Sequence, residues 1–170
     1  DLTAWGVLSD LENQSITGHL ASVASFIRSD LARRMQQAAE AQHLYREMPF
    51  TLAVPAQGVW PQDQGFAADD QALVQGIIDG WFIAGDQAVL FDYKTDRLTG
   101  DPLTIRAALL KRYARQLSYY ARAISQATRL PVAEHCIVHL PSQQVLIYSA
   151  DELAAADRPD PGKSSQEDRS

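Results

Sequence analysis

The sequence predicts an α/β domain with a mixed central β-sheet flanked by helices. Segments with helical spacing of apolar residues and segments typical of strands follow one another in the order helix, three strands, helix, two strands. The chain has 170 residues, which is enough for one domain with a single core and too few to expect two domains.

A helical segment is expected over residues 15–42, within an N-terminal region at 1–42. This segment is rich in Ala, Gln and Arg, which favour helices. One helix, or two with a break near Ser29 and Asp30, are both possible because Ser and Asp are good N-cap residues. The apolar residues at intervals of three and four positions are Leu20, Val23, Ile27 and Leu31.

Three strands are expected next, at the start of a core region at 43–150. Residues 44–54 alternate in polarity, and Pro49 indicates an edge strand or a bulge. A polar loop at 55–71 then leads to GIIDGWFIAGDQAVLFDYKTDR at 76–97. Apolar residues occupy both faces of this stretch, so we expect an interior hairpin.

A long helix and two more strands are expected in the second half of the chain. The helix at 103–128 follows a turn at 100–102, and the strands cover 132–140 and 144–149. The remaining region at 151–170 is small, polar and charged, which is typical of a flexible tail.

The composition excludes several classes of protein. No apolar run approaches the roughly 18 to 20 residues of a membrane span, and the N-terminus lacks the pattern of a signal peptide. We therefore expect a cytoplasmic protein that does not contact a membrane. The single cysteine, Cys136, excludes a disulfide framework or an all-cysteine metal cluster within this chain.

The basic residues are concentrated in one segment. A net charge of −6 argues at first against a nucleic-acid partner, because phosphate binding is driven by basic surface. Between residues 97 and 130, however, seven basic residues occur with a single acid, Asp101. The basic residues are Arg97, Arg106, Lys111, Arg112, Arg115, Arg122 and Arg129.

Three charged residues interrupt the predicted hairpin. With a two-residue type II′ turn at Gly85–Asp86, residues whose numbers sum to 171 face each other, and this places Asp79 opposite Asp92. Directly opposed residues have Cβ atoms about 4.5 to 5.5 Å apart and share a face. Lys94, two residues beyond Asp92, lies on that face as well. The predicted register therefore brings two carboxylates and an ammonium group together.

Two carboxylates held this close repel each other unless a cation lies between them. A divalent metal resolves the conflict, and ligands that are all oxygen favour Mg²⁺ or Mn²⁺ over Zn²⁺. Lys94 can then orient a metal-bound water and balance charge on a phosphoryl group. The alternative is a buried Asp–Lys ion pair that only fixes the register.

Further residues can support this site. Glu47 on the first strand is either a third acid or an ordinary surface residue. Arg112, Gln116 and Tyr120 recur every four residues and share one stripe of the long helix, where they can contact a phosphate or a metal-bound water. We expect Arg112 and Arg115, with Gln116 and Tyr120, to contact DNA. The alternative is a solvated helix face with Tyr120 half-buried.

In order and spacing, the segments GIID, DYKT and RYARQLSYY resemble the RecB-type nucleases of the PD-(D/E)xK fold. Residues 31–149 are more closely similar to the C-terminal nuclease domain of the AddA (RexA) subunits of bacterial ATP-dependent helicase-nucleases. This resemblance implies a restriction-endonuclease-like core in which Asp79 and Asp92 bind Mg²⁺ and Lys94 is the catalytic lysine. The other matching positions are Glu47, Gln116 and Tyr120.

The resemblance also implies a function and partners. Such a domain is a metal-dependent deoxyribonuclease that cleaves single strands of DNA. The helicase portion of the same polypeptide would first unwind the duplex, during double-strand break repair and recombination. ATP would belong to that portion, and an iron–sulfur cluster to the AddB (RexB) partner subunit. The alternative is a non-catalytic module of the same fold that holds DNA or docks a subunit.

One family motif is missing from this sequence. The family has a Gly-x-x-x-His motif on an upstream helix, whose histidine completes the metal site. In SITGHL, Gly18 is instead adjacent to His19. We expect the matching histidine to lie before Asp1, so that this chain alone would have an incomplete metal site.

Overall fold

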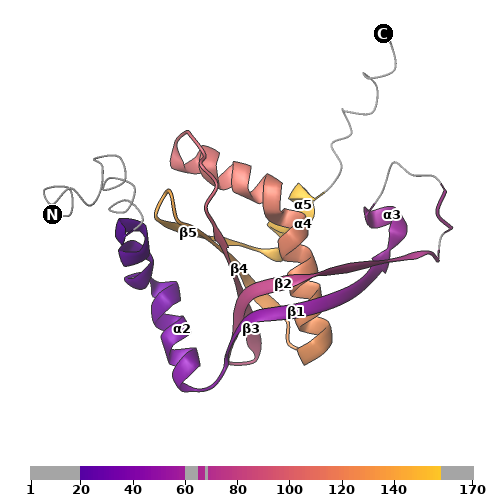
Figure 1. Cartoon of the computed structure of the whole chain (residues 1–170), viewed down its shortest axis with the longest axis horizontal. Helices are drawn as coiled ribbons and strands as arrows, with labels where there is room; N and C mark the ends of the chain where they lie inside the picture. Colours follow the sequence, from indigo (N-terminus) through magenta and orange to yellow (C-terminus); the bar gives the residue numbers. More distant parts are fainter. Residues whose placement is uncertain (1–19, 60–64, 68, 158–170) are drawn as a thin grey trace, which may run out of the picture.

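A five-stranded mixed sheet forms the centre of the computed structural model, which describes residues 20–59, 65–67 and 69–157. The strand order is β1-β2-β3-β4-β5, and helices cover both faces of the sheet (Figure 1). The predicted fold class is therefore confirmed. The elements are α2 (Asp30–Glu40), β1 (Leu44–Pro55), α3 (Ala56–Val59), β2 (Gln71–Ala84), β3 (Gln87–Lys94), α4 (Pro102–Thr128), β4 (Val132–His139), β5 (Gln144–Tyr148) and α5 (Ala150–Ala156).

One parallel strand pair makes the sheet mixed. β3 and β4 run parallel, whereas the other neighbouring strands pair antiparallel. A parallel pair needs a crossover connection, and α4 provides it between these two strands. β1 and β2 continue beyond the end of β3 as a two-stranded arm, with α3 near its tip (Figure 1).

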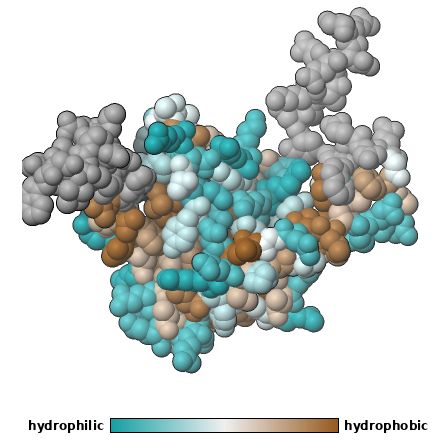
Figure 2. All heavy atoms as spheres, viewed as in Figure 1, coloured by the Kyte–Doolittle hydropathy of each residue, from teal (hydrophilic) through white to brown (hydrophobic). Residues whose placement is uncertain are grey.

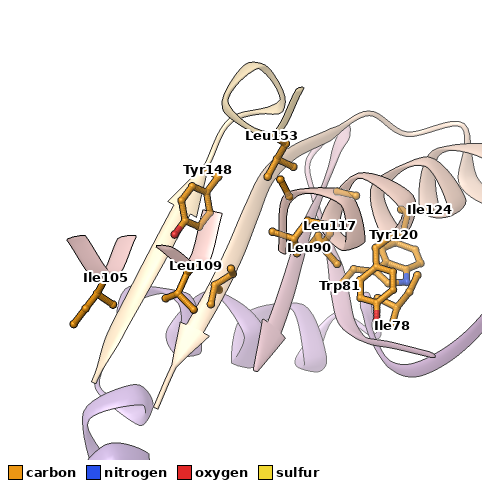
Figure 3. Packing of buried hydrophobic residues seen from close by; sticks show 13 residues of the cluster. Ile78, Trp81, Leu90, Ile105, Leu109, Leu117, Tyr120, Ile124, Tyr148 and Leu153 are labelled. Atoms are coloured by element: carbon orange, nitrogen blue, oxygen red, sulfur yellow. The ribbon is translucent and has the colours of Figure 1, made fainter. Parts of the chain in front are cut away.

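Helix α4 packs on one face of the sheet and α2 on the other. Successive strand residues point to opposite faces, so the strands present apolar side chains to both helices. On the α4 face, Tyr120 lies beside Ile78 and Trp81 of β2 (Figure 3). The opposite face buries Leu31, Met35 and Ala38 of α2. In β2, β3 and β4, the residues that pack with α2 are Phe82, Val89, Phe91, Cys136 and Val138.

A third, smaller core holds the arm together. Leu52 and Val54 of β1 pack with Ala72 of β2, and Tyr119 of α4 lies against them. The surface seen in Figure 2 is largely hydrophilic, with separate hydrophobic areas. No helix among the described residues is long and apolar enough to span a membrane.

The N-terminal helical segment is divided in two. Residues 20–27 are helical, and a second helix, α2, begins after Ser29, whose side chain accepts a hydrogen bond from the Ala32 backbone N–H. The break near Ser29 is one of the two predicted possibilities. Residues 1–19, including His19, lie outside the described part of the chain.

Part of the segment expected to be a flexible tail is helical. α5 begins after Ser149, which forms a capping box with Glu152, and Leu153 is buried against the core on the α4 face. The capping box and the burial of Leu153 together explain why this short segment folds into a helix. Residues 158–170 lie outside the described part of the chain.

Candidate active site

The hairpin between β2 and β3 has the predicted turn. Gly85 has a φ of +67°, whereas the φ of Asp86 is not positive, which agrees with a type II′ turn. Ala84 pairs with Gln87, and the predicted register continues to the pair of Gly80 and Phe91. The turn thus sets the register as the sequence indicated.

The hydrogen-bonded ladder between β2 and β3 ends at this pair. Asp79 and Asp92 do not form a ladder pair, and the Oδ2 atom of Asp79 instead accepts a hydrogen bond of 2.9 Å from the Tyr93 backbone N–H. The physical reason is that the two strands separate here. β3 continues along β4, where Asp92 pairs with Ile137, while β2 continues with β1 into the arm. Both acids therefore lie where β2 and β3 diverge.

Asp92 is a buried carboxylate beside a lysine. Its side chain is 1% exposed, and Lys94 Nζ lies 2.5 Å from Asp92 Oδ2. This contact is a buried ion pair between the Asp92 carboxylate and the Lys94 ammonium group. Burial raises the pKa of Asp92, the Lys94 ammonium opposes this rise, and the charge of Asp79 adds to it.

Gln116 and Tyr120 join this pair from α4. Lys94 Nζ donates to Gln116 Oε1 at 3.0 Å, and Gln116 Nε2 donates to the Tyr120 hydroxyl at 2.6 Å. Burial raises the pKa of Tyr120, Gln116 partly offsets this, and the charges of Asp92 and Asp79 raise it further. The structure thus brings together five of the predicted site residues.

Three residues beside this group were not identified from the sequence. Tyr113 lies under the lysine, with Lys94 Nζ 4.2 Å from its ring centroid. The Tyr113 hydroxyl donates to Asp96 Oδ2 at 2.5 Å. The backbone oxygen of Asp96 lies 2.7 Å from His139 Nε2. The available signals were the position of Tyr113 one helical turn before Gln116 and that of Asp96 two residues after Lys94.

The histidine side chains of β4 make further contacts. His139 Nδ1 lies 2.7 Å from Ser142 Oγ, and His135 Nδ1 lies 3.2 Å from the Tyr148 backbone oxygen. Both histidines are buried in β4. These contacts hold each imidazole ring in place within the sheet.

Glu47 lies near the site in register, but on the surface. It is exposed, it has a φ of +52°, and it interrupts the β1–β2 ladder between Arg46 and Met48. By register this position is opposite Asp79. Within residues 20–59, 65–67 and 69–157, no three His, Cys, Asp or Glu side chains form a group that could hold a metal ion.

The two predicted DNA-binding arginines already have acidic partners. Arg112 Nη1 lies 2.9 Å from Asp96 Oδ1, and the Arg112 side chain is 60% exposed. Arg115 Nε lies 2.7 Å from Asp157 Oδ1, which also raises the pKa of Arg115. Only Arg112 is thereby connected to the group around Lys94.

The residues present fit a hard divalent cation in part. Asp92 offers a buried carboxylate, whose Oδ2 lies 2.5 Å from Lys94 Nζ, and the Asp79 carboxylate is close enough for its charge to act on Asp92. Mg²⁺ is commonly bound through one or two carboxylates while it keeps several water molecules. Two carboxylates are therefore enough to anchor it.

The chain is similar to segments of much longer bacterial proteins. It is 38% identical over 133 residues to the AddA ATP-dependent helicase/nuclease subunit of Carboxydothermus hydrogenoformans, a match that covers 78% of this chain and 10% of the relative. The protein of the same name from Geobacillus thermodenitrificans is 38% identical over 125 residues, and that from Exiguobacterium sibiricum is 31% identical over 144 residues. No model of a known protein family matches the chain. The chain spans about a tenth of the length of these relatives.

Proposed function

We propose that the chain is a magnesium-dependent DNA nuclease domain of an AddA-type helicase/nuclease polypeptide, of the RecB-type PD-(D/E)xK class. The observation that carries this proposal is the buried Asp92–Lys94 pair, which lies beside Asp79 where β2 and β3 diverge and is bonded to Gln116 of α4. The similarity to helicase/nuclease subunits supports the same interpretation independently of the geometry.

Asp79 and Asp92 would hold the metal through their oxygens. When bound, Mg²⁺ supplies Lewis-acid activation of a phosphoryl oxygen and lowers the pKa of a bound water. Lys94 places a positive charge next to the carboxylates, where it can stabilise negative charge that develops on a phosphate. The Tyr120 hydroxyl accepts from Gln116 and keeps its own proton, since its pKa is raised, so it can donate to a phosphate oxygen.

The wider context is part of the proposal and rests on the resemblance to AddA-type subunits. The substrate would be single-stranded DNA delivered by a helicase portion of the same polypeptide, in the repair and recombination of double-strand breaks. The AddB protein would assemble with that polypeptide. ATP and an iron–sulfur cluster would act elsewhere in the complex.

The test is cleavage of single-stranded DNA by the full-length polypeptide in its native assembly. Wild-type protein should cleave with Mg²⁺ and stop on addition of EDTA, and Asp92→Ala or Lys94→Ala should each abolish cleavage while unwinding continues. Asp86→Ala, which removes an exposed acid from the hairpin turn, is the matched control and should cleave normally. Cleavage that persists in both site variants would exclude the proposed mechanism.

A second function, a non-catalytic module that holds DNA or docks a subunit, is favoured by a specific observation. The charges of the site are partly compensated without a metal, because Asp79 accepts from a backbone N–H and Asp92 pairs with Lys94. This alternative predicts that mutation of Asp79 or Asp92 leaves both divalent-metal binding and DNA cleavage unchanged.

A further inference from the structure

We propose that Tyr113 is a positioning residue for Lys94, and that its ring holds the lysine ammonium in place for the reaction. The inference rests on the proposed function, in which Lys94 acts on the scissile phosphate. It gives a role to Tyr113, which lies within the segment RYARQLSYY but was not among the predicted site residues.

Three groups surround the Lys94 ammonium. Asp92 Oδ2 lies 2.5 Å from Nζ and Gln116 Oε1 accepts from it at 3.0 Å. The ring centroid of Tyr113 lies 4.2 Å from the same atom. A cation within about 6 Å of an aromatic ring centroid is attracted to the negative face of the ring. The lysine side chain is 13% exposed, so little water competes with these contacts.

The Tyr113 ring is itself fixed from its outer end. Its hydroxyl donates to Asp96 Oδ2, and the other carboxylate oxygen of Asp96 pairs with Arg112. Burial and the Asp96 carboxylate raise the pKa of Tyr113 to about 12, so the hydroxyl remains a donor at neutral pH. A ring held in this way can keep one orientation toward the ammonium.

The backbone on both sides of this contact is also tied to the end of β4. The Lys94 carbonyl accepts from the Leu140 N–H at 3.0 Å, and the Asp96 carbonyl is contacted by His139 Nε2 at 2.7 Å. The end of β4 therefore holds the backbone of both Lys94 and Asp96. Through the Tyr113–Asp96 hydrogen bond, α4 is joined to the same segment.

The ring matters most when a cation binds Asp92. A cation held by Asp92 would share the charge of the carboxylate, so the attraction between Asp92 and Lys94 would weaken and a repulsive charge would lie beside the ammonium. Gln116 and Tyr113 then hold the ammonium by contacts that do not depend on Asp92. Without the ring, Lys94 would leave its position more often, and the chemical step would slow without a change in DNA binding.

Tyr113 also packs against the core on the α4 face, so a test must separate packing from electrostatics. Phenylalanine and its mono-, di- and trifluorinated analogues at position 113 keep nearly the same shape while fluorine weakens the negative ring face. The same analogues at Tyr119, a partly buried tyrosine of α4 that packs in the arm, form the matched control. Because every variant is nearly isosteric, folding is preserved across the series.

The measurement is the single-turnover cleavage rate of the full-length polypeptide at saturating single-stranded DNA, with KM determined in parallel. We expect the rate to fall stepwise with fluorination at position 113, by about tenfold over the series, with KM unchanged. The Tyr119 series should give a constant rate. Equal rates across the Tyr113 series, or a parallel fall in the Tyr119 series, would overturn the inference.

A Lys94→Met variant separates this inference from the proposed function. If Lys94→Met is inactive and the Tyr113 series is flat, the function stands and the positioning role of Tyr113 is rejected. If Lys94→Met cleaves as fast as wild type, the proposed role of Lys94 fails, and the positioning of Lys94 fails with it.

Discussion

Asp92 carries a carboxylate that is 1% exposed and lies next to the ammonium of Lys94. Such a group is costly to bury, and its ion pair with Lys94 compensates part of that cost. A buried acid next to a second acid is typical of a site that gains a ligand. This residue therefore links the stability of the fold to its proposed chemistry.

Gly80 is where the hairpin ladder ends, and it has no room for a side chain. A Cβ atom at this position would overlap the ring of Phe91, which is fully buried. We predict that Gly80→Ala lowers the free energy of unfolding by about 1 to 3 kcal/mol, because the buried ring must move. Urea unfolding measures this change.

Gly58 provides the matched control for that substitution. A Cβ atom at Gly58 in α3 meets nothing within 4 Å, so Gly58→Ala should leave the free energy of unfolding unchanged or raise it by up to about 1 kcal/mol. Equal destabilisation by the two substitutions would show that the Phe91 ring does not restrict position 80.

At the residue scale, the sequence predicted the central group but not its surroundings. Asp79, Asp92 and Lys94 were found because charges are unexpected in an apolar hairpin. Tyr113 and Asp96 were missed because a tyrosine in a helix and an aspartate in a loop are ordinary residues. Only the distances between their side chains identify them as neighbours of the lysine.

Helix α4 carries different polar residues on two of its sides. Gln116 and Tyr120 face the acids, whereas Lys111, Arg115 and Arg122 lie four and eleven residues apart and so share another side. These three basic residues are exposed, and α4 contains no Asp or Glu. Among the described residues, Lys111 and Arg122 make no ion pair.

The basic side of α4 gives a prediction about DNA binding. If it carries phosphate contacts, a Lys111→Ala/Arg122→Ala double variant should weaken single-stranded DNA binding and reduce the slope of log K against log salt by about 1.4. Binding of single-stranded DNA by the full-length polypeptide over a salt series measures this slope.

Arg33→Ala is the control for this charge removal. It removes an exposed basic residue from α2, on the opposite face of the sheet, and should leave the slope unchanged. An unchanged slope in the double variant would show that this side of α4 does not contact DNA.

At the element scale, the periodicity of apolar residues predicted the order of helices and strands. It did not predict α5, because a segment of seven residues carries little periodicity, and this helix depends on a capping box and on the burial of Leu153. It also did not predict the separation of β2 from β3 at Asp79. That separation depends on β1 and β4, which pair with these strands from distant parts of the chain.

At the scale of the whole molecule, the site lies where the sheet divides. β3 and β4 continue together while β2 leaves with β1 into the arm, and α4 crosses the opening with Gln116 and Tyr120. The cores on both faces of the sheet hold these elements firmly around it. The mixed sheet was predictable from the element order, but the division that forms the site arises only from the complete fold.

Asp79 and Asp92 are proposed to bind a divalent metal at this division of the sheet. Mn²⁺ binding to the full-length polypeptide without nucleotide, followed by electron paramagnetic resonance, tests this proposal most directly. We predict that Asp79→Asn and Asp92→Asn each bind at least one fewer Mn²⁺ than wild type, whereas the turn variant Asp86→Asn binds the same number. Equal Mn²⁺ binding by wild type and both site variants would contradict the proposed metal site.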